Sequence, residues 1–143
     1  CAAYIRAARK AGYGGTFYNV SFVGTQALAD ELGKDGAGVV VSQVVPSPYS
    51  AARPITREFV AAARQGGGQV QANYSSMEGY LAAKVFAEGL RRAARPSREG
   101  LIAALEGINE DFGGYRVNFG AGQHVASRFV ELSMLTGDGR IRT

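Results

Sequence analysis

The stretch Gly38-Val39-Val40-Val41-Ser42-Gln43-Val44-Val45-Pro46 carries the strongest structural signal in the sequence, because five of its nine residues are valine. A nearly continuous run of β-branched residues is typical of a strand that is covered on both faces, as in a parallel sheet. The segment Pro46-Ser47-Pro48 then breaks the run. We therefore expect a buried parallel strand over residues 38–45 and a break directly after it.

The residues before this strand alternate between helical and extended patterns. Residues 2–10 place apolar side chains on one helical face, and Gly12 ends that helix. Residues 16–20 are short, aromatic and apolar, which indicates a buried strand. Residues 25–32 repeat leucine at a spacing of four after Thr25, which is expected to cap the helix. This order of helix, strand, helix and strand predicts the α/β fold class.

Three helices are expected after the valine-rich strand, over residues 54–65, 75–94 and 97–108. Pro54 suits the first turn of a helix, and the pattern from Ser75 to Glu78 is that of a capping box. Each helix presents an apolar face, which has to pack against a sheet.

The end of the chain changes to the period of strands. Residues 115–119 alternate, and residues 129–135 alternate again after a glycine-rich loop, which predicts a β-hairpin. Gly137-Asp138-Gly139 is a turn signal, and Ile141 is expected to begin a last short strand. These strands are too few to cover three helices. We therefore expect an uncovered apolar surface through which the chain self-associates.

The composition is that of a globular protein and excludes several functions. The chain has 143 residues, which is the length of one ordinary domain. Its net charge of +4 comes from basic residues spread along the whole chain, so no nucleic-acid partner is expected. No apolar run approaches the roughly 18 residues that a membrane span needs.

The single cysteine, Cys1, excludes an internal disulfide and leaves two interpretations open. A bacterial lipoprotein carries its lipid on an N-terminal cysteine, but such proteins begin with a flexible polar tether, whereas residues 2–10 have a helical pattern. The favoured interpretation is an ordinary helix residue. The chain has no initiator methionine or signal peptide and opens within a helix, so it is interpreted as a fragment.

The sequence shows no set of catalytic or metal-binding residues. His124 is the only histidine and lies in a glycine-rich loop, with no nucleophile or acid that would make it part of a triad. One histidine, one cysteine and scattered acids lack the spacing of a metal site. The glycines lack the Lys-Ser/Thr pattern of a phosphate loop. We therefore expect no enzymatic activity, and no metal or cofactor.

Three blocks of sequence together resemble one known family. They are Phe17-Tyr18-Asn19-Val20-Ser21-Phe22-Val23-Gly24-Thr25-Gln26-Ala27-Leu28, the stretch from Gly38 to Pro46, and Ser76-Met77-Glu78-Gly79-Tyr80-Leu81-Ala82-Ala83-Lys84. Their order and spacing resemble the C-terminal portion of type I periplasmic solute-binding proteins. These are extracellular ligand-binding receptors of ABC importers of the Leu/Ile/Val (branched-chain amino acid) type. The resemblance covers essentially the whole chain, although each block alone is weak.

The resemblance implies a portion of a two-lobed α/β protein, in which three chain crossovers join lobes that close by hinge bending. Residues 1–43 would be the tail of the second lobe. Residues 44–135, with three helices and a β-hairpin, would be the C-terminal part of the first lobe. Residues 136–143 would form a C-terminal turn and short strand. The hinge crossover would lie near residues 44–48, at Val44, Val45 and Pro46.

The resemblance also implies ligand contacts at Ser21 and Phe22. These residues follow a strand and precede a helix N-terminus, which is where open α/β sheets bind ligands. Receptors of the Leu/Ile/Val type carry an acid at the position of Ser21, for the ligand ammonium. A hydroxyl cannot supply that charge, so an aromatic or aliphatic acid, an amide, or an amino acid held by other groups stays open as the ligand. The alternative interpretation is a plain strand-to-helix turn.

Further ligand contacts are implied at Tyr74, Ser75 and Ser76, which precede the last matching block, and at Tyr49, just beyond the hinge prolines. For the two serines, capping of the helix alone is the alternative.

The resemblance implies an extracytoplasmic, periplasmic solute-binding component, whose signal peptide is not within these residues. Such a protein captures an amino acid or a related carboxylate or amide by lobe closure and delivers it to a membrane permease. The alternative is a ligand-sensing domain of a regulator or receptor with the same fold.

Overall fold

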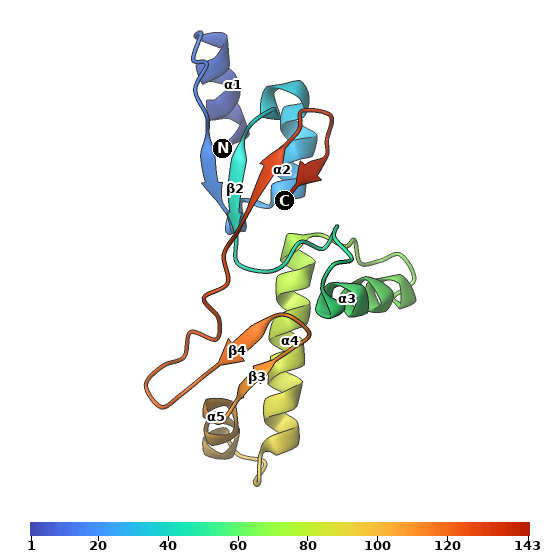
Figure 1. The fold of residues 1–143 in the computed structure, drawn as a ribbon, viewed down its shortest axis with the longest axis vertical. Helices are drawn as coiled ribbons and strands as arrows, with labels where there is room; N and C mark the ends of the chain where they lie inside the picture. The colour runs from blue at the N-terminus through green and yellow to red at the C-terminus, as the bar shows by residue number, and fades with distance from the viewer.

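The computed structural model describes residues 1–143 and divides them into two parts (Figure 1). The sheet part contains α1 (Ala2–Lys10), β1 (Tyr18–Val20), η1 (Ser21–Val23), α2 (Thr25–Leu32), η2 (Gly33–Gly36), β2 (Val40–Gln43), β5 (Glu131–Leu135) and β6 (Ile141–Arg142). The helical part contains α3 (Pro54–Gln65), α4 (Tyr74–Arg92), α5 (Arg98–Glu106), β3 (Asn109–Asp111) and β4 (Arg116–Asn118). Residues 44–53 form the first connecting segment between the parts, and residues 119–130 form the second.

The sheet part holds both ends of the chain and a four-stranded sheet in the order β1-β2-β5-β6. β1 and β2 are parallel and joined through α2, as the alternating pattern predicts, whereas β5 is antiparallel to β2. α1 and α2 cover one face of the sheet. The core on that face consists of Ile5, Leu28, Ala29, Leu32, Val39, Val41 and Leu135.

The opposite face of this sheet is uncovered. Tyr18, Val20, Leu132 and Met134 occupy paired positions on it and are 44–74% exposed. The expectation that the valine-rich strand is covered on both faces is therefore wrong for this chain. The strand is also shorter than predicted. It ends at Gln43, and Val44 and Val45 belong to the first connecting segment.

The position of β5 corrects the division predicted from the sequence. Residues 129–135 were expected to pair with residues 115–119 and to lie with the helices. Instead, β5 pairs with β2, in a register that places Ser133 opposite Val41, and Leu135 packs in the core of the sheet part. The hairpin of the helical part is β3 with β4. Alternation along a strand shows which residues share a face, but it does not identify the partner strand.

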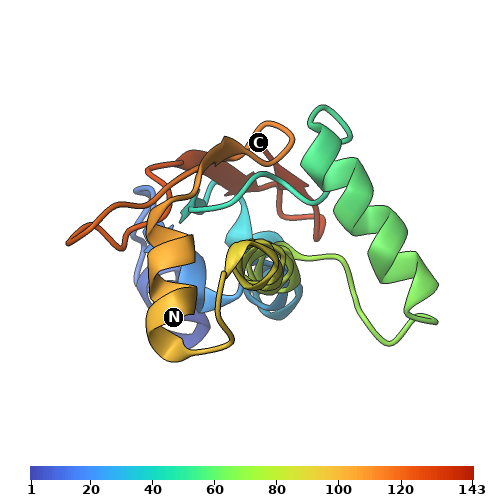
Figure 2. The ribbon, with the colours of Figure 1, turned by 90° about the horizontal axis from the view of Figure 1, so that it is seen from below.

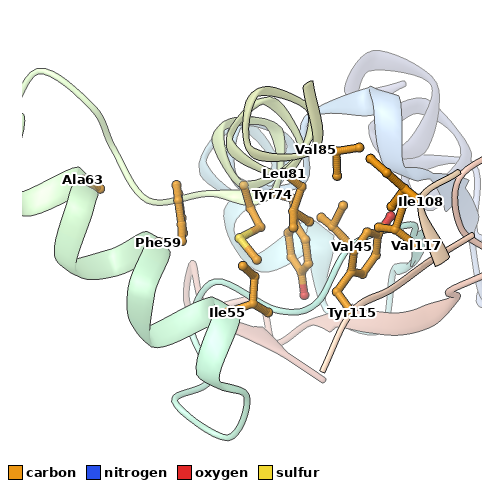
Figure 3. Close-up of a cluster of buried hydrophobic side chains, with 11 residues drawn as sticks. Val45, Ile55, Phe59, Ala63, Tyr74, Leu81, Val85, Ile108, Tyr115 and Val117 are labelled. Atoms are coloured by element: carbon orange, nitrogen blue, oxygen red, sulfur yellow. The ribbon is translucent and has the colours of Figure 1, made fainter. Parts of the chain in front are cut away.

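The helical part is built around α4, with α3 and α5 on opposite sides of it (Figures 1 and 2). Its core collects side chains from the first connecting segment, α3, α4 and the hairpin (Figure 3). The buried residues are Val45, Ile55, Phe59, Ala63, Tyr74, Met77, Leu81, Val85, Ile108, Tyr115 and Val117. Within α4, Met77, Leu81 and Val85 repeat at a spacing of four, as expected for a helix that buries one face.

The helix starts follow local rules, with two differences from the sequence-based expectation. Thr25 does not cap α2, because Gly24 is the N-cap residue and the Thr25 hydroxyl accepts a hydrogen bond from Gln43 instead. Pro54 is the first residue of α3, and the side chain of Ser97 caps α5, as predicted. The capping box of α4 is formed by Asn73 and Ser76 and not by Ser75 and Glu78. The Asn73 side chain accepts a hydrogen bond from the Ser76 backbone, so the cap lies two residues earlier than expected.

No helix in the structure is both long enough and apolar enough to cross a membrane.

Candidate functional site

Ser21 and Phe22 lie where the sequence predicts them, between β1 and α2. β1 ends at Val20, and a single turn of 3-10 helix carries Ser21 and Phe22 to Gly24, which has a φ of 73°. The Phe22 side chain is 88% exposed, although it is a large apolar group. This arrangement presents an aromatic surface at the carboxyl end of a parallel strand, next to a helix N-terminus.

Tyr49 joins the first connecting segment to the sheet part. Its hydroxyl donates a hydrogen bond to Gln26 Oε1 at 3.2 Å, in the first turn of α2. Its ring meets the ring of Tyr74 edge to face, with the centroids 5.7 Å apart. Burial raises the pKa of Tyr49 to about 12, and the neighbouring Tyr74 and Asp30 add to the shift. Tyr49 is therefore a neutral donor at ordinary pH.

Tyr74 is the first residue of α4 and is only 4% exposed. Its hydroxyl makes no hydrogen bond within the protein, which is costly for a buried polar group. Burial raises the pKa of Tyr74, and nearby Glu131 raises it further. Tyr74 therefore brings an unengaged phenol to the place where the two parts meet.

Ser75 and Ser76 differ in how much of their hydrogen-bonding capacity is free. The Ser76 hydroxyl donates to the Gln71 carbonyl at 2.6 Å and accepts from the Asn73 N–H at 3.0 Å, so the helix cap occupies it. The Ser75 side chain is exposed and makes no hydrogen bond. Of the two serines predicted to contact a ligand, Ser75 therefore has a hydroxyl available for hydrogen bonding, whereas the Ser76 hydroxyl is used in the helix cap.

A buried polar network beneath this site could not be found from the sequence. Gln43 Nε2 donates to Thr25 Oγ1 at 2.8 Å and to Ser133 Oγ at 2.7 Å. Ser133 in turn donates to the Val41 carbonyl at 3.2 Å. The only signal in the sequence is a glutamine within a run of valines. Its partners cannot be inferred, because Ser133 is ninety residues away along the chain.

The two connecting segments leave the sheet part side by side. Gln43 and Glu131 are register partners at the ends of β2 and β5, and Glu131 accepts a hydrogen bond from the Ser47 N–H at 3.2 Å. Of the predicted hinge residues, Val44 is 41% exposed, Val45 packs in the core of the helical part, and Pro46 is buried. These contacts form one narrow junction between the parts.

The junction contains no histidine. His124 lies away from it, on the second connecting segment, where its Nε2 is 3.0 Å from Glu106 Oε1 on α5 and its side chain is exposed. No group of three or more His, Cys, Asp or Glu residues in the structure is arranged to hold a metal ion.

Comparison with known proteins identifies the family. The sequence model described as periplasmic binding protein matches residues 1–139. Among proteins of curated function, none matches the chain in sequence.

Several solved structures share the fold. A possible leucine/isoleucine/valine-binding protein from Rhodopirellula baltica is 32% identical with a TM-score of 0.92, over 99% of this chain and 39% of its own. An extracellular ligand-binding receptor from Verminephrobacter eiseniae is 29% identical with a TM-score of 0.84, over 99% of this chain and 41% of its own. A substrate-binding periplasmic protein from Ralstonia solanacearum is 30% identical with a TM-score of 0.86, over 98% of this chain and 41% of its own.

The chain thus spans about two fifths of the length of these proteins. The fold prediction, an α/β portion of a type I periplasmic binding protein, is confirmed, and this chain belongs to the periplasmic binding protein family.

Proposed function

We propose that this chain is part of the extracytoplasmic solute-binding component of an ABC importer. In this role it captures an amino acid or a related small carboxylate or amide and delivers it to a membrane permease. The observation that carries the proposal is that Tyr49 contacts both Gln26, in the first turn of α2, and Tyr74, at the start of α4, while Phe22 is exposed on the turn just before α2. The relatives named as ligand-binding receptors and substrate-binding proteins support it.

Capture would proceed by closure of the two parts on the ligand, with no bond made or broken. The parts have separate hydrophobic cores and are joined by two segments that leave the sheet side by side. A junction of this kind suits a hinge, because backbone rotation in a few residues changes the angle between two rigid bodies. Val44, Val45 and Pro46 are the proposed hinge residues in the first segment.

The groups that this chain offers to a ligand are neutral. Ser21 stands at the position of the acid that binds the ligand ammonium in receptors of the Leu/Ile/Val type, and Tyr49 and Tyr74 are phenols that stay protonated. Such groups satisfy hydroxyl, carbonyl or amide atoms, and Phe22 and Tyr49 provide apolar surface. We therefore propose that the ligand is a related carboxylate or amide, or an amino acid whose ammonium group is bound by residues other than Ser21.

The test is ligand binding by the full natural protein, with whatever sequence flanks residues 1–143. Leucine, valine, phenylalanine, phenylacetate, benzoate and short amides are screened by thermal shift, and hits are measured by calorimetry. A ligand at a hundred times its Kd stabilises the native state by about 2.7 kcal/mol, which a thermal shift detects easily. Absence of any shift across amino acids, carboxylates and amides would contradict the proposal.

Variants then locate the site. Phe22→Ala is expected to raise the Kd by about tenfold or more, because an aromatic contact to the ligand is lost. Tyr74→Phe removes only the phenol and is expected to raise the Kd by a smaller factor. Tyr4→Ala, at another exposed aromatic residue, is the matched control and leaves the Kd unchanged. Equal affinities in all three variants would place the ligand elsewhere.

Delivery to a permease is tested separately from binding. Deleting the gene is expected to abolish high-affinity uptake of the radiolabelled ligand, and Phe22→Ala to reduce it. Uptake that is unchanged while ligand-dependent gene expression is lost would instead favour the alternative function, a ligand-sensing domain.

We also propose that residues 1–143 self-associate when they are produced alone. An apolar hollow of about 350 Å³ opens on the helical part, lined by Val44, Leu81 and Phe86 among others, and Phe86 is 50% exposed. Sedimentation velocity is expected to show a sedimentation coefficient that rises with concentration. Phe86→Ser is expected to reduce this rise, and a compact monomer at high concentration would contradict the proposal.

A further inference from the structure

A separate polar hollow of about 500 Å³ lies away from the Phe22 site, between the hairpin of the helical part and the second connecting segment. Three arginines line it, and each comes from a different segment. Arg53 immediately precedes α3, Arg116 lies on β4, and Arg128 lies on the second connecting segment. Asp111 is the only acid in the lining.

The three arginines of this hollow outnumber its one acid, Asp111, which lies opposite Arg116 in the hairpin. None of the three arginines forms an ion pair, although other arginines, such as Arg6 and Arg92, do so. The single acid, Asp111, is engaged by the backbone N–H of Gly114. The hollow is therefore lined by three arginines, and no carboxylate lies within ion-pair distance of any of them.

Two of the three guanidinium groups are held in place by neutral partners. Arg53 Nη1 donates to the Gly114 carbonyl at 2.8 Å, and its guanidinium stacks over the ring of Phe129, 5.2 Å from the centroid. Arg116 Nη2 donates to Asn109 Oδ1 at 2.6 Å. Each contact uses only part of the five-donor guanidinium, so N–H groups remain for a ligand. Arg128 is exposed and has no hydrogen-bond partner within the protein.

Held arginines with spare donors favour oxyanions in particular. The planar fork of a guanidinium matches two oxygens of a phosphate group, and charge-assisted hydrogen bonds of this kind are stronger than neutral ones. Ser127, which also lines the hollow, adds a neutral donor. Several arginines from different segments can therefore contact one anion from several sides, which a single surface arginine cannot do.

We propose that the hollow formed by Arg53, Arg116 and Arg128 is a binding site for a phosphate group. The group belongs either to free inorganic phosphate or to the headgroup of an anionic phospholipid, since both present the same oxygens. The site uses residues other than those assigned to solute capture, so it stands or fails independently of the proposed transport function.

The test measures binding of inorganic phosphate to the full natural protein by calorimetry, with sodium chloride adjusted to keep the ionic strength constant. We expect saturable binding with a stoichiometry near one. The variant R116Q/R128Q is expected to raise the Kd for phosphate by at least about tenfold, because it removes two of the three charges. The variant R64Q/R98Q removes two exposed arginines outside the hollow and is expected to leave the Kd unchanged. Non-saturable binding, or the same loss in both variants, would overturn the proposal.

A second arm distinguishes the two sources of the phosphate group. Co-sedimentation is measured with phosphatidylcholine vesicles that contain or lack phosphatidic acid. Binding only to the phosphatidic acid vesicles, lost in R116Q/R128Q but not in R64Q/R98Q, identifies a lipid headgroup. Phosphate binding without vesicle binding identifies free phosphate. Vesicle binding that both double variants weaken equally would reflect general charge and would overturn a headgroup site.

Discussion

The sheet part and the helical part differ in how their helices and strands pack to form a hydrophobic core. The sheet part packs two helices on one face of its sheet and leaves the other face open, with Tyr18 and Leu132 mostly exposed. The helical part wraps α3 and a small hairpin around α4 and forms a larger core of its own. Among the partly buried apolar side chains, only that of Ile141 packs against both cores.

The contacts between the parts differ in kind from those within them. Each core is apolar, whereas the junction contains the bond from Ser47 to Glu131 and the bond from Tyr49 to Gln26. Hydrogen bonds exposed to solvent at their edges can be exchanged for bonds to water at little net cost, but apolar contacts cannot be exchanged in this way. The sheet part and the helical part, each with its own apolar core and with polar contacts at the junction, can therefore move relative to each other.

The largest expected effects come from emptying one core at a time. Phe59→Ala in the helical part is expected to lower the free energy of unfolding by about 3–5 kcal/mol, and Leu28→Ala in the sheet part by about 2–5 kcal/mol. Because the cores are separate, native-state hydrogen exchange should lose protection mainly in the part that carries the substitution. Equal loss of protection in both parts, from either variant, would show a single cooperative core.

The buried polar network around Gln43, inside the sheet part, is expected to contribute less to stability than either core. Gln43→Leu leaves the Thr25 and Ser133 hydroxyls without their donor and is expected to cost about 1–3 kcal/mol of unfolding free energy. Urea denaturation measures the change, with Gln65→Leu, at an exposed glutamine, as the control. A stabilised Gln43→Leu protein would mean that the network is not needed for stability.

The helix cap at the start of α4 is expected to make a smaller contribution to the free energy of unfolding. Asn73→Ala removes the acceptor for the Ser76 backbone N–H and is expected to cost about 1 kcal/mol. Ser75→Ala is expected to change the free energy of unfolding by less than about 0.5 kcal/mol, because its hydroxyl makes no hydrogen bond. Thermal denaturation of both variants distinguishes the observed cap from the one that the sequence predicted, since the predicted cap reverses the order.

The smallest expected effect is a dependence of stability on alkaline pH. Burial, with the hydrogen bond to Glu58, raises the pKa of Tyr80 from its ordinary 10.0 to about 12. The native state therefore keeps this proton at a pH where the unfolded state loses it. Its contribution is complete below pH 10 and is lost as the pH rises towards 12.

Denaturation curves between pH 9 and pH 12 check this expectation. Tyr80→Phe should make the free energy of unfolding fall less steeply than in the parent protein. Tyr13→Phe, at an exposed tyrosine, is the matched control. An unchanged slope in Tyr80→Phe would contradict the expectation.

Local rules explain most of what the sequence predicted correctly. Pro54 and Ser97 mark helix starts through effects within one turn, and the spacing of Met77, Leu81 and Val85 identifies a buried helix face. The strand-to-helix turn at Phe22 also follows from neighbouring residues. Each of these features depends on side chains only a few positions apart.

Features that depend on distant partners were not predictable in the same way. The pairing of β5 with β2 joins residues about ninety positions apart, and alternation fits several possible partners equally well. The bonds of Gln43 to Ser133 follow from this pairing and were missed with it. The start of α4 was misplaced for a different reason, because Asn73 and Ser75 both precede suitable residues and only the backbone geometry selects between them.

Small-angle X-ray scattering of the full natural protein tests the central claim most directly, with and without the panel compound that binds most tightly. If the two parts close about the junction on a small ligand, the radius of gyration falls at saturation, and the fall is reduced in Phe22→Ala at the same compound concentration. A radius of gyration that stays constant while calorimetry shows full occupancy would contradict closure as the means of capture.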